Sequence, residues 1–177
     1  MPTIINIEQL RENIDFIATS MASYMCDCLV ICLTEAGHSV GVDIKVETDL
    51  KNYDFSIFWE TKVTQHLIGA TRDEQRTTEW AAMGFAFILV RYLTEYPYIR
   101  TSRKGSGIDF FLSKNPTELS CDARLEISGI KKTSAKNTIV QRFEVKKKQT
   151  KLSDDTATPV FISITEFSEP KSLFKQK

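Results

Sequence analysis

Two acidic residues occupy matching positions in neighbouring extended segments. Asp109 lies between two apolar residues, Ile108 and Phe110, and Glu126 lies in the same way within the apolar segment 124–130. Because alternate residues of a strand point to opposite faces, each strand directs one carboxylate away from its apolar side. Antiparallel pairing about the middle of the loop, between Thr117 and Glu118, would place the two acids directly opposite each other, with Cβ atoms about 4.5 to 5.5 Å apart.

The chemistry that suits such a pair is the binding of a divalent cation. Like charges directly across a strand pair destabilise it unless a cation lies between them or one carboxylate is protonated. Mg²⁺, which prefers carboxylate oxygens, or Mn²⁺ is therefore the expected cofactor. Two alternatives stay open: both carboxylates face solvent, or Arg124, Lys114 or a residue of the basic helix that follows neutralises them.

A scaffold of helices and strands has to position this hairpin. The pattern of apolar residues predicts a helix over 73–94, strands over 98–102, 108–113 and 124–130, a basic helix over 135–152 and a strand over 159–167. Apolar residues surround more than one face of the first helix, which is typical of a helix buried between layers. Ser134 is the predicted N-cap of the basic helix, and the residues after 167 are expected to form a loose tail.

The amino-terminal part has its own pattern. Apolar residues at spacings of three and four predict a helix over 7–36, capped by Asn6 and ended by Gly37. Two extended segments, 40–46 and 55–63, then predict a hairpin, and a loop is expected before residue 73. The sequence thus predicts one α/β (α+β) domain over 1–177, with an extension of helix and hairpin over 1–70 and a core over 73–167.

The core segment, in the order α-β-β-β-α-β, resembles the PD-(D/E)XK superfamily of restriction-endonuclease-like nucleases. The resemblance implies a mixed β-sheet flanked by helices and metal ligands from the second and third core strands, here Asp109 and Glu126. It also implies further metal ligands from Glu79 on the preceding helix and from the backbone carbonyl of Ile127. The implied reaction is hydrolysis of a phosphodiester, with the metal polarising a phosphoryl oxygen and lowering the pKa of a bound water.

The chain departs from the family pattern at one position. The lysine that the family carries two residues after the acid of the third strand is Ser128 here. A serine hydroxyl can bind water but cannot stabilise developing negative charge as a cation does. Either another cation reaches the site or the site is catalytically inactive. Arg142, Lys146 and Gln149 share one face of the basic helix and are the candidates for such a replacement. The resemblance to family members with polar residues on this helix implies Arg142 and Gln149 as contacts to phosphate or water. The alternative for this helix is a solvated basic surface.

Charge is divided unevenly along the chain. Residues 1–98 contain 7 Lys and Arg against 14 Asp and Glu, whereas residues 99–177 contain 16 against 9. A basic carboxy-terminal half is compatible with a nucleic-acid partner, DNA in this interpretation, and equally with a solvated helix and tail. The acidic extension over 1–70 suits a homodimer interface or a protein partner.

Several classes of protein are disfavoured. No basic segment precedes an apolar run at the start, and the longest apolar stretch, 80–90, is too short to span a bilayer, so no membrane association is expected. Three of the four cysteines fall on one predicted helix, which indicates a reducing, cytoplasmic location rather than a disulfide framework. Motifs of P-loop, dinucleotide-binding and serine-hydrolase sites do not occur.

Three hypotheses follow. The first is a metal-dependent nuclease, or a diverged relative of one, acting in DNA defence or processing. The second is a non-catalytic module of the same fold that binds nucleic acid or a protein. The third is an unrelated α+β binding or immunity-type protein in which the two acids are structural.

Overall fold

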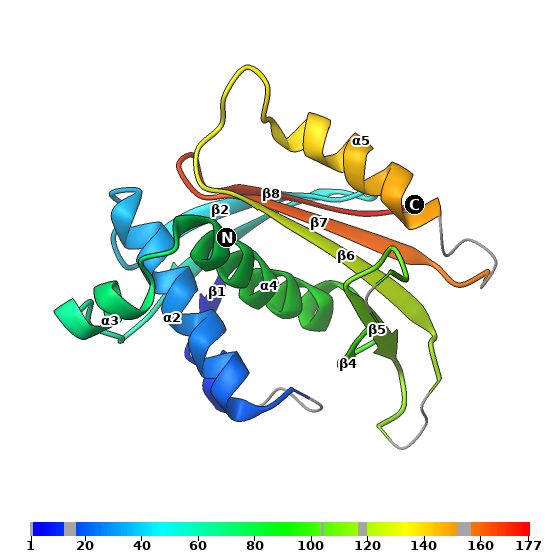
Figure 1. Ribbon diagram of the computed structural model, residues 1–177, viewed down its shortest axis with the longest axis horizontal. Coiled ribbons are helices and arrows are strands. Elements are labelled where there is room, and N and C mark those ends of the chain that lie inside the picture. Colours follow the sequence, from blue (N-terminus) through cyan, green and yellow to red (C-terminus); the bar gives the residue numbers. More distant parts are fainter. Residues whose placement is uncertain (1, 13–16, 104, 117–119, 152–156) are drawn as a thin grey trace.

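A computed structural model describes residues 2–12, 17–103, 105–116, 120–151 and 157–177. The chain has a mixed α/β architecture in which an eight-stranded mixed sheet is flanked by helices (Figure 1). The elements along the chain are β1 (Thr3–Asn6), α1 (Gln9–Glu12), α2 (Thr19–Glu35), β2 (Val42–Glu47), β3 (Asn52–Phe58), α3 (Gln65–Ala70), α4 (Glu74–Leu93), β4 (Tyr98–Thr101), β5 (Phe110–Ser113), β6 (Ala123–Ile130), α5 (Ile139–Gln149), β7 (Val160–Glu166) and β8 (Lys171–Gln176).

The sheet has the strand order β1-β3-β2-β8-β7-β6-β5-β4. β4, β5 and β6 form the antiparallel meander that the sequence predicts, and β6 runs parallel to β7. β8 is antiparallel to β7 and parallel to β2, so it joins the two halves of the sheet. The hairpin of β2 and β3 was expected in an extension, but it belongs to the same sheet as the predicted core strands.

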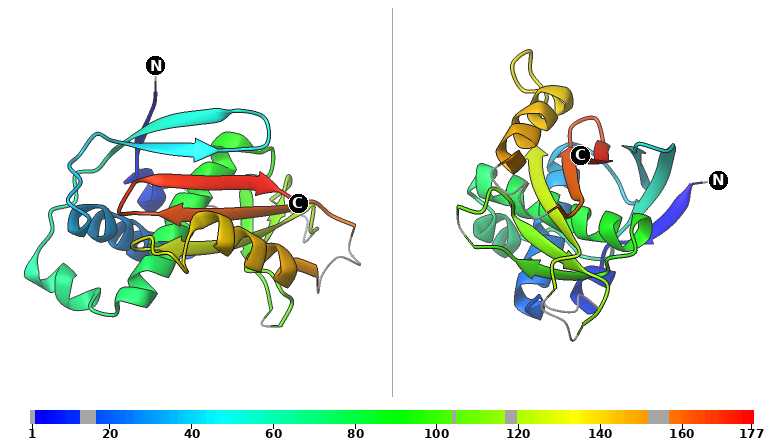
Figure 2. Two further views of the ribbon diagram at one scale, coloured as in Figure 1. Left: turned by 90° about the horizontal axis from the view of Figure 1, so that it is seen from above. Right: turned by 90° about the vertical axis from the view of Figure 1, so that its right-hand side faces the viewer.

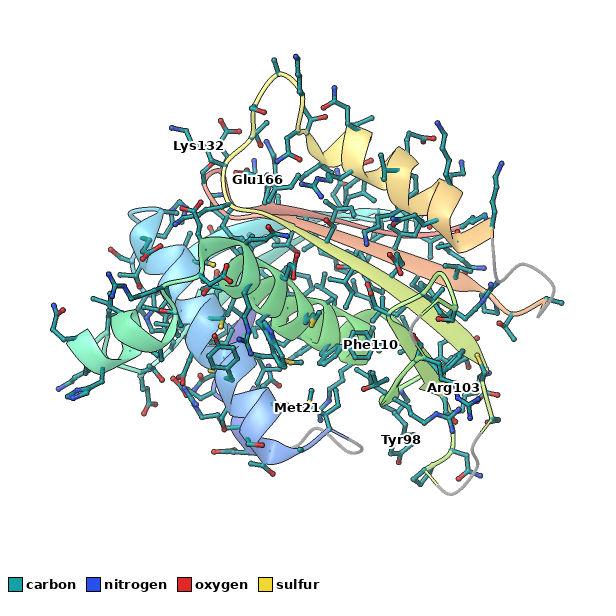
Figure 3. All side chains as sticks on the ribbon, viewed as in Figure 1. Met21, Tyr98, Arg103, Phe110, Lys132 and Glu166 are labelled. Atoms are coloured by element: carbon teal, nitrogen blue, oxygen red, sulfur yellow. The ribbon has the colours of Figure 1, made fainter. Side chains whose placement is uncertain are left out.

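Helices cover the two faces of the sheet differently. α2 and α4 pack together on one face, and α5 lies on the other face over β6 and β7 (Figure 2). The larger apolar core lies on the α2 and α4 side and includes Phe87 and Phe110, whose ring centroids are 4.9 Å apart in an edge-to-face arrangement (Figure 3). A smaller cluster around Ile162 and Ile164 of β7 packs against Phe143 of α5.

α4 has the bounds and the burial that its sequence predicts. The Asp73 side chain accepts a hydrogen bond from the Arg76 N–H and caps the first turn, and the helix ends at Leu93, four residues before Pro97. Buried residues from Thr77 to Val90 surround much of the helix. This apolar helix therefore fills the space between the sheet and α2.

The close approach of α4 to β6 depends on Gly129. A Cβ atom at this position would lie 2.5 Å from the carbonyl oxygen of Thr78 and 3.1 Å from the Ala82 Cβ. Because the nearest atom belongs to the backbone of a buried helix, any larger side chain would push α4 away from the sheet.

The amino-terminal prediction of one helix over 7–36 is wrong. Residues Thr3–Asn6 form β1, parallel to β3, and two helices, α1 and α2, follow; residues 13–16, which the predicted helix spans, lie outside the described part of the chain. Asn6 accepts a hydrogen bond from the Glu8 N–H across this strand-to-helix turn. The buried Ile5 and Ile7 fit strand alternation as well as helical spacing, and pairing with β3 decides between the two.

Three further predictions are wrong at the level of single elements. α5 begins at Ile139 with Thr138 and Gln141 as a capping box, whereas Ser134, the predicted N-cap, pairs with Asn137 before the helix. The expected loop before residue 73 contains the short helix α3. The expected loose tail contains β8, because it fills the gap between β7 and β2.

Replacing Gly129 tests the packing of α4 on the sheet. Gly129→Ala is expected to lower the free energy of unfolding by about 1–3 kcal/mol, because overpacking displaces a backbone rather than a flexible side chain. The measurement is urea denaturation. Gly69→Ala is the matched control, since a Cβ there meets open space on α3 and its effect should stay within about 1 kcal/mol. Equal stabilities of the two variants would contradict the proposed contact.

Candidate active site

The β5–β6 hairpin brings Asp109 and Glu126 together. The paired residues of β5 and β6 end with Phe110 opposite Leu125, and directly beyond this end the Asp109 N–H donates a 3.1 Å hydrogen bond to the Leu125 carbonyl. The predicted register is confirmed for Phe110–Leu112 against Ala123–Leu125, and its continuation by one residue brings Asp109 beside Glu126. Thr117 and Glu118, at the predicted loop midpoint, lie outside the described residues. Both acids lie on the α5 side of the sheet, because Phe110 and Leu125 belong to the core on the opposite side.

Asp109 is held in place by the neighbouring strand. β5 begins at Phe110, and beyond this end the Asp109 Oδ2 atom accepts a 2.8 Å hydrogen bond from the Ile127 N–H of β6. The side chain of Asp109 thus occupies the place of a strand partner, which fixes its direction. Ile127 thus contacts Asp109 through its backbone N–H. The resemblance, in contrast, implies the backbone carbonyl of Ile127 as a metal ligand.

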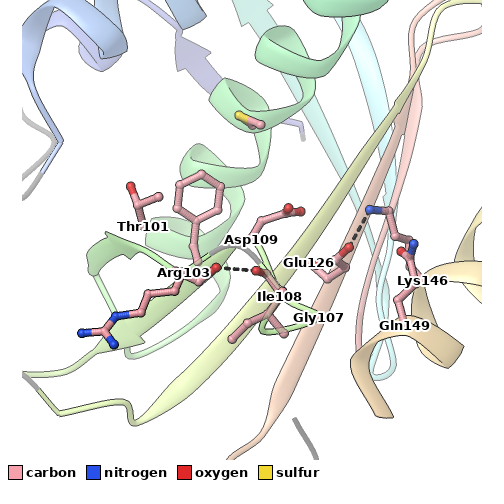
Figure 4. Close-up of a pocket in the computed structure, with 12 residues that line it drawn as sticks. Thr101, Arg103, Gly107, Ile108, Asp109, Glu126, Lys146 and Gln149 are labelled. Carbon is pink, nitrogen blue, oxygen red and sulfur yellow. Dashed lines mark hydrogen bonds and ion pairs between the residues drawn. The ribbon is translucent and has the colours of Figure 1, made fainter. Parts of the chain in front are cut away.

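Glu126 is buried and receives a cation from the other face of the pocket. Only 4% of the residue is exposed, and its Oε1 atom accepts a 2.5 Å hydrogen bond from Lys146 Nζ of α5 (Figure 4). The Lys146 side chain is itself only 18% exposed. This ion pair is therefore shielded from solvent far more than a surface pair.

The second carboxylate oxygen of Glu126, Oε2, lacks a hydrogen-bond partner. It is buried, and no donor of the described residues reaches it. Burial and the negative charge of Asp109 raise the pKa of Glu126 to about 7, while Lys146 acts in the opposite direction; a hydrogen bond between the two carboxyl groups also favours the protonated form. Near neutral pH the pair therefore either shares a proton or needs a second cation.

A divalent cation suits these donors. Asp109 and Glu126 offer carboxylate oxygens on one side of the hairpin, and Glu126 Oε2 has no competing donor. Mg²⁺ keeps several waters and is held by one or two carboxylates together with substrate phosphates, so a third protein ligand is not required. Within the described ranges there is no cluster of three or more His, Cys, Asp or Glu side chains that could form a complete cage.

The pair lies in a pocket of about 600 Å³ between the β4–β5 connection and α5. The lining comprises Met83 of α4, Glu126 of β6, Lys146 and Gln149 of α5, and Thr101, Ser102, Arg103, Gly105, Gly107, Ile108, Asp109 and Phe110. Gly105 and Gly107 have φ angles of +90° and +76°, which favour glycine and allow this connection to turn at the pocket mouth. Arg103 lines the pocket, but its guanidinium group points away from the two carboxylates (Figure 4).

Four predicted site residues, Ile127, Glu79, Arg142 and Ser128, do not line this pocket. Glu79 is exposed on α4 and accepts a hydrogen bond from Gln75, and Met83, one turn further along, occupies the pocket wall instead. Arg142 is bonded to Asn137 at the start of α5. Ser128 is buried in β6, two residues beyond Glu126.

Lys146 is the cation that contacts Glu126, and a pattern of spacing in the sequence could have identified it. Ile139, Phe143, Lys146 and Thr150 recur at spacings of four, three and four along one stripe of α5. Ile139 and Phe143 pack against β7, and Thr150 is fully buried. A lysine within the stripe that faces the sheet must find a partner on the sheet, whereas Lys147 and Lys148 are exposed.

Comparison of the chain with protein-family models, with curated proteins and with solved structures gives no match. None of the described helices is both long enough and apolar enough to cross a membrane.

The raised pKa of Glu126 predicts a specific pH dependence of stability. The folded state binds a proton up to about pH 7, whereas the unfolded carboxyl loses it near 4.5. Since the folded state therefore holds more protons in this window, this contribution to stability is complete below 4.5 and is lost as the pH rises to 7. The free energy of unfolding of wild type should therefore fall between about pH 5 and about pH 8. Glu126→Gln should make this fall smaller by on the order of a few kcal/mol.

Urea denaturation in the presence of a chelator measures this difference. Glu144→Gln, an exposed carboxylate on α5, is the matched control and should retain the wild-type pH dependence. If the free energy of unfolding falls equally for Glu126→Gln and wild type between the two pH values, the raised pKa of a buried Glu126 carboxyl is contradicted.

Proposed function

We propose that this protein is a metal-dependent phosphodiester hydrolase that acts on nucleic acid, DNA in the first instance, with Mg²⁺ or Mn²⁺ as cofactor. The observation that carries the proposal is the pair of Asp109, half-buried, and Glu126, buried, in one pocket, with Lys146 bonded to Glu126. Opposed carboxylates beside a cation suit a metal that must bind both protein and an anionic substrate. DNA defence or processing is the corresponding biological role.

The order of elements supports the same proposal. α4, β4, β5, β6, α5 and β7 follow one another in the order that the resemblance to the PD-(D/E)XK superfamily implies. Asp109 directly precedes the second strand of that order, and Glu126 falls on the third. A restriction-endonuclease-like core is therefore part of the proposal.

The residues of the pocket would divide the work as follows. Asp109 and Glu126 would hold the metal, which when bound polarises a phosphoryl oxygen and lowers the pKa of a water. Lys146 would supply to the site the positive charge that Ser128 cannot provide. It also favours the ionised form of Glu126. Gln149 lines the same pocket and offers its amide to a phosphate oxygen or to water.

The exposed face of α5 suits the polyanion. Lys147 and Lys148 are exposed in the last turn of the helix, close in sequence to Gln149 at the pocket. Cations near a helix carboxy terminus are also favoured by the helix dipole. Phosphates bound along this face would lead toward the carboxylate pair.

A cleavage assay tests the proposed active site. Asp109→Asn and Glu126→Gln keep the shape of each side chain but weaken metal binding, so each should reduce cleavage of DNA in Mg²⁺ or Mn²⁺ by about 100-fold or more. Lys146→Met should reduce it by about 100-fold, because a charge aimed at the developing anion is lost. Plasmid and single-stranded DNA are the two substrates.

Glu144→Gln, on the solvent side of α5, and Lys62→Met, at an exposed lysine outside the proposed DNA interface, are the matched controls, and both should retain cleavage within a few-fold of wild type. Cleavage that persists in both Asp109→Asn and Glu126→Gln would exclude this site.

Salt dependence tests the nucleic-acid interface separately. The logarithm of the affinity for duplex DNA should fall linearly with the logarithm of salt concentration, by roughly 0.9 per phosphate contact, and Lys148→Gln should reduce the slope by about one contact. Lys62→Gln, an exposed lysine in the acidic half, should leave the slope unchanged. Fluorescence anisotropy measures both, and absence of binding at low salt removes nucleic acid as the partner.

A non-catalytic module of the same fold is the second candidate. It is favoured by Ser128 in place of a lysine and by the ion pair that occupies Glu126 Oε1. DNA binding with the expected salt slope but without cleavage in either metal would support this module over the hydrolase. Protein partners or a homodimer formed through residues 1–70 stay a prediction.

A further inference from the structure

A second pocket, of about 360 Å³, lies away from the carboxylate pair, at the carboxy-terminal end of α4. It forms where the turn between β2 and β3, the last residues of β8 and the start of β7 meet. Asp49 in this turn accepts a hydrogen bond from the Gln176 N–H of β8, which holds the two segments together. Its lining shares no residue with the active-site pocket, so its chemistry is separate from the proposed function.

Aromatic rings form much of the wall of this second pocket. Tyr53, Tyr96, Phe161 and Phe174 line it, with ring centroids 5.9 Å apart for Tyr96 and Phe161 and 5.5 Å apart for Phe161 and Phe174. They come from β3, from the connection after α4, and from β7 and β8. Rings from separate elements therefore surround one cavity, and a ring face turned toward an occupant offers it the negative part of the ring quadrupole.

The charges at the pocket have one sign. Asp49 and Glu95 line it, and no Lys or Arg of the described residues does so. The pocket also receives Leu93 and Thr94, the end of α4, where the helix dipole contributes partial negative charge. Glu95 is bonded to Lys114 at 2.6 Å, so Asp49 is the carboxylate that most favours a positively charged occupant.

The protein already places its own cations over two of these rings. Lys51 Nζ lies 4.6 Å from the centroid of the Tyr53 ring, and Lys114 Nζ lies 5.2 Å from that of Tyr96. Neither lysine is among the residues that line the cavity. Each contact shows a ring of this wall with a cation near its centroid.

We propose that this pocket binds a small organic cation of the quaternary or alkylated ammonium class. Such a group carries a diffuse positive charge on an apolar surface, which matches aromatic walls with a carboxylate at the rim. The volume lies at the lower end of the range for small-molecule sites, which fits a compact head group. The source is a free metabolite or a trimethylated lysine side chain, which share this chemistry.

Calorimetric titration of the full chain tests the proposal with three probes. Choline and N-acetyl-trimethyllysine methylamide carry the cation, and 3,3-dimethylbutanol is the uncharged analogue of choline with the same shape. Saturable binding of choline at millimolar or lower concentration, about tenfold tighter than the analogue, is expected. Tighter binding of the lysine derivative than of choline assigns the source to a modified peptide, and the reverse order assigns it to a free metabolite.

Variants locate the binding. Tyr53→Leu and Asp49→Asn should each weaken choline binding by several-fold or more, and Asp54→Asn, a carboxylate on the opposite face of β3, should not. Thermal unfolding confirms that each variant is folded. Equal affinity for choline and its uncharged analogue, no saturable binding of either cation, or unchanged affinity in both pocket variants would overturn the proposal.

Discussion

The backbone hydrogen bonds of the β5–β6 hairpin force two carboxylates into one small volume. Phe110 pairs with Leu125, and Asp109 directly beyond this pair is hydrogen-bonded to the Leu125 carbonyl and to the Ile127 N–H, on either side of Glu126. The repulsion of the two carboxylates is balanced by the Ile127 N–H on Asp109 and by Lys146 on Glu126, and one buried oxygen, Glu126 Oε2, is left without a donor. The raised pKa of Glu126 follows from its burial and from this proximity, and the proposed metal binding and hydrolysis depend on the same proximity.

α5 completes the site from the opposite side of the pocket. Its capping box fixes the start of the helix, and Ile139 and Phe143 fix the face that packs on β7. Given that packing, Lys146 has to point at β6, where Glu126 is the partner. The positive charge that the resemblance places two residues after Glu126, at Ser128, thus comes instead from another element.

α4 and the continuous sheet connect the two pockets. Met83 of α4 lines the pocket with the carboxylate pair, and Leu93 at the end of the helix lines the aromatic pocket. Because β8 joins β7 to β2, the aromatic pocket combines residues from both halves of the sheet. Strand pairing between distant parts of the chain thereby creates a site that neither half contains.

The sequence by itself determined the elements whose partners are close along the chain. The burial of α4 follows from its run of apolar residues, and the register that opposes Asp109 and Glu126 follows from alternation on both sides of one loop. The tertiary structure alone decided the pairing of β1 and of β8, since short segments with mixed patterns become strands only when an open sheet edge is beside them. It also decided that Lys146 reaches the acids while Glu79 and Arg142 lie outside the pocket, because helical spacing gives a shared face but not the direction in which packing turns it.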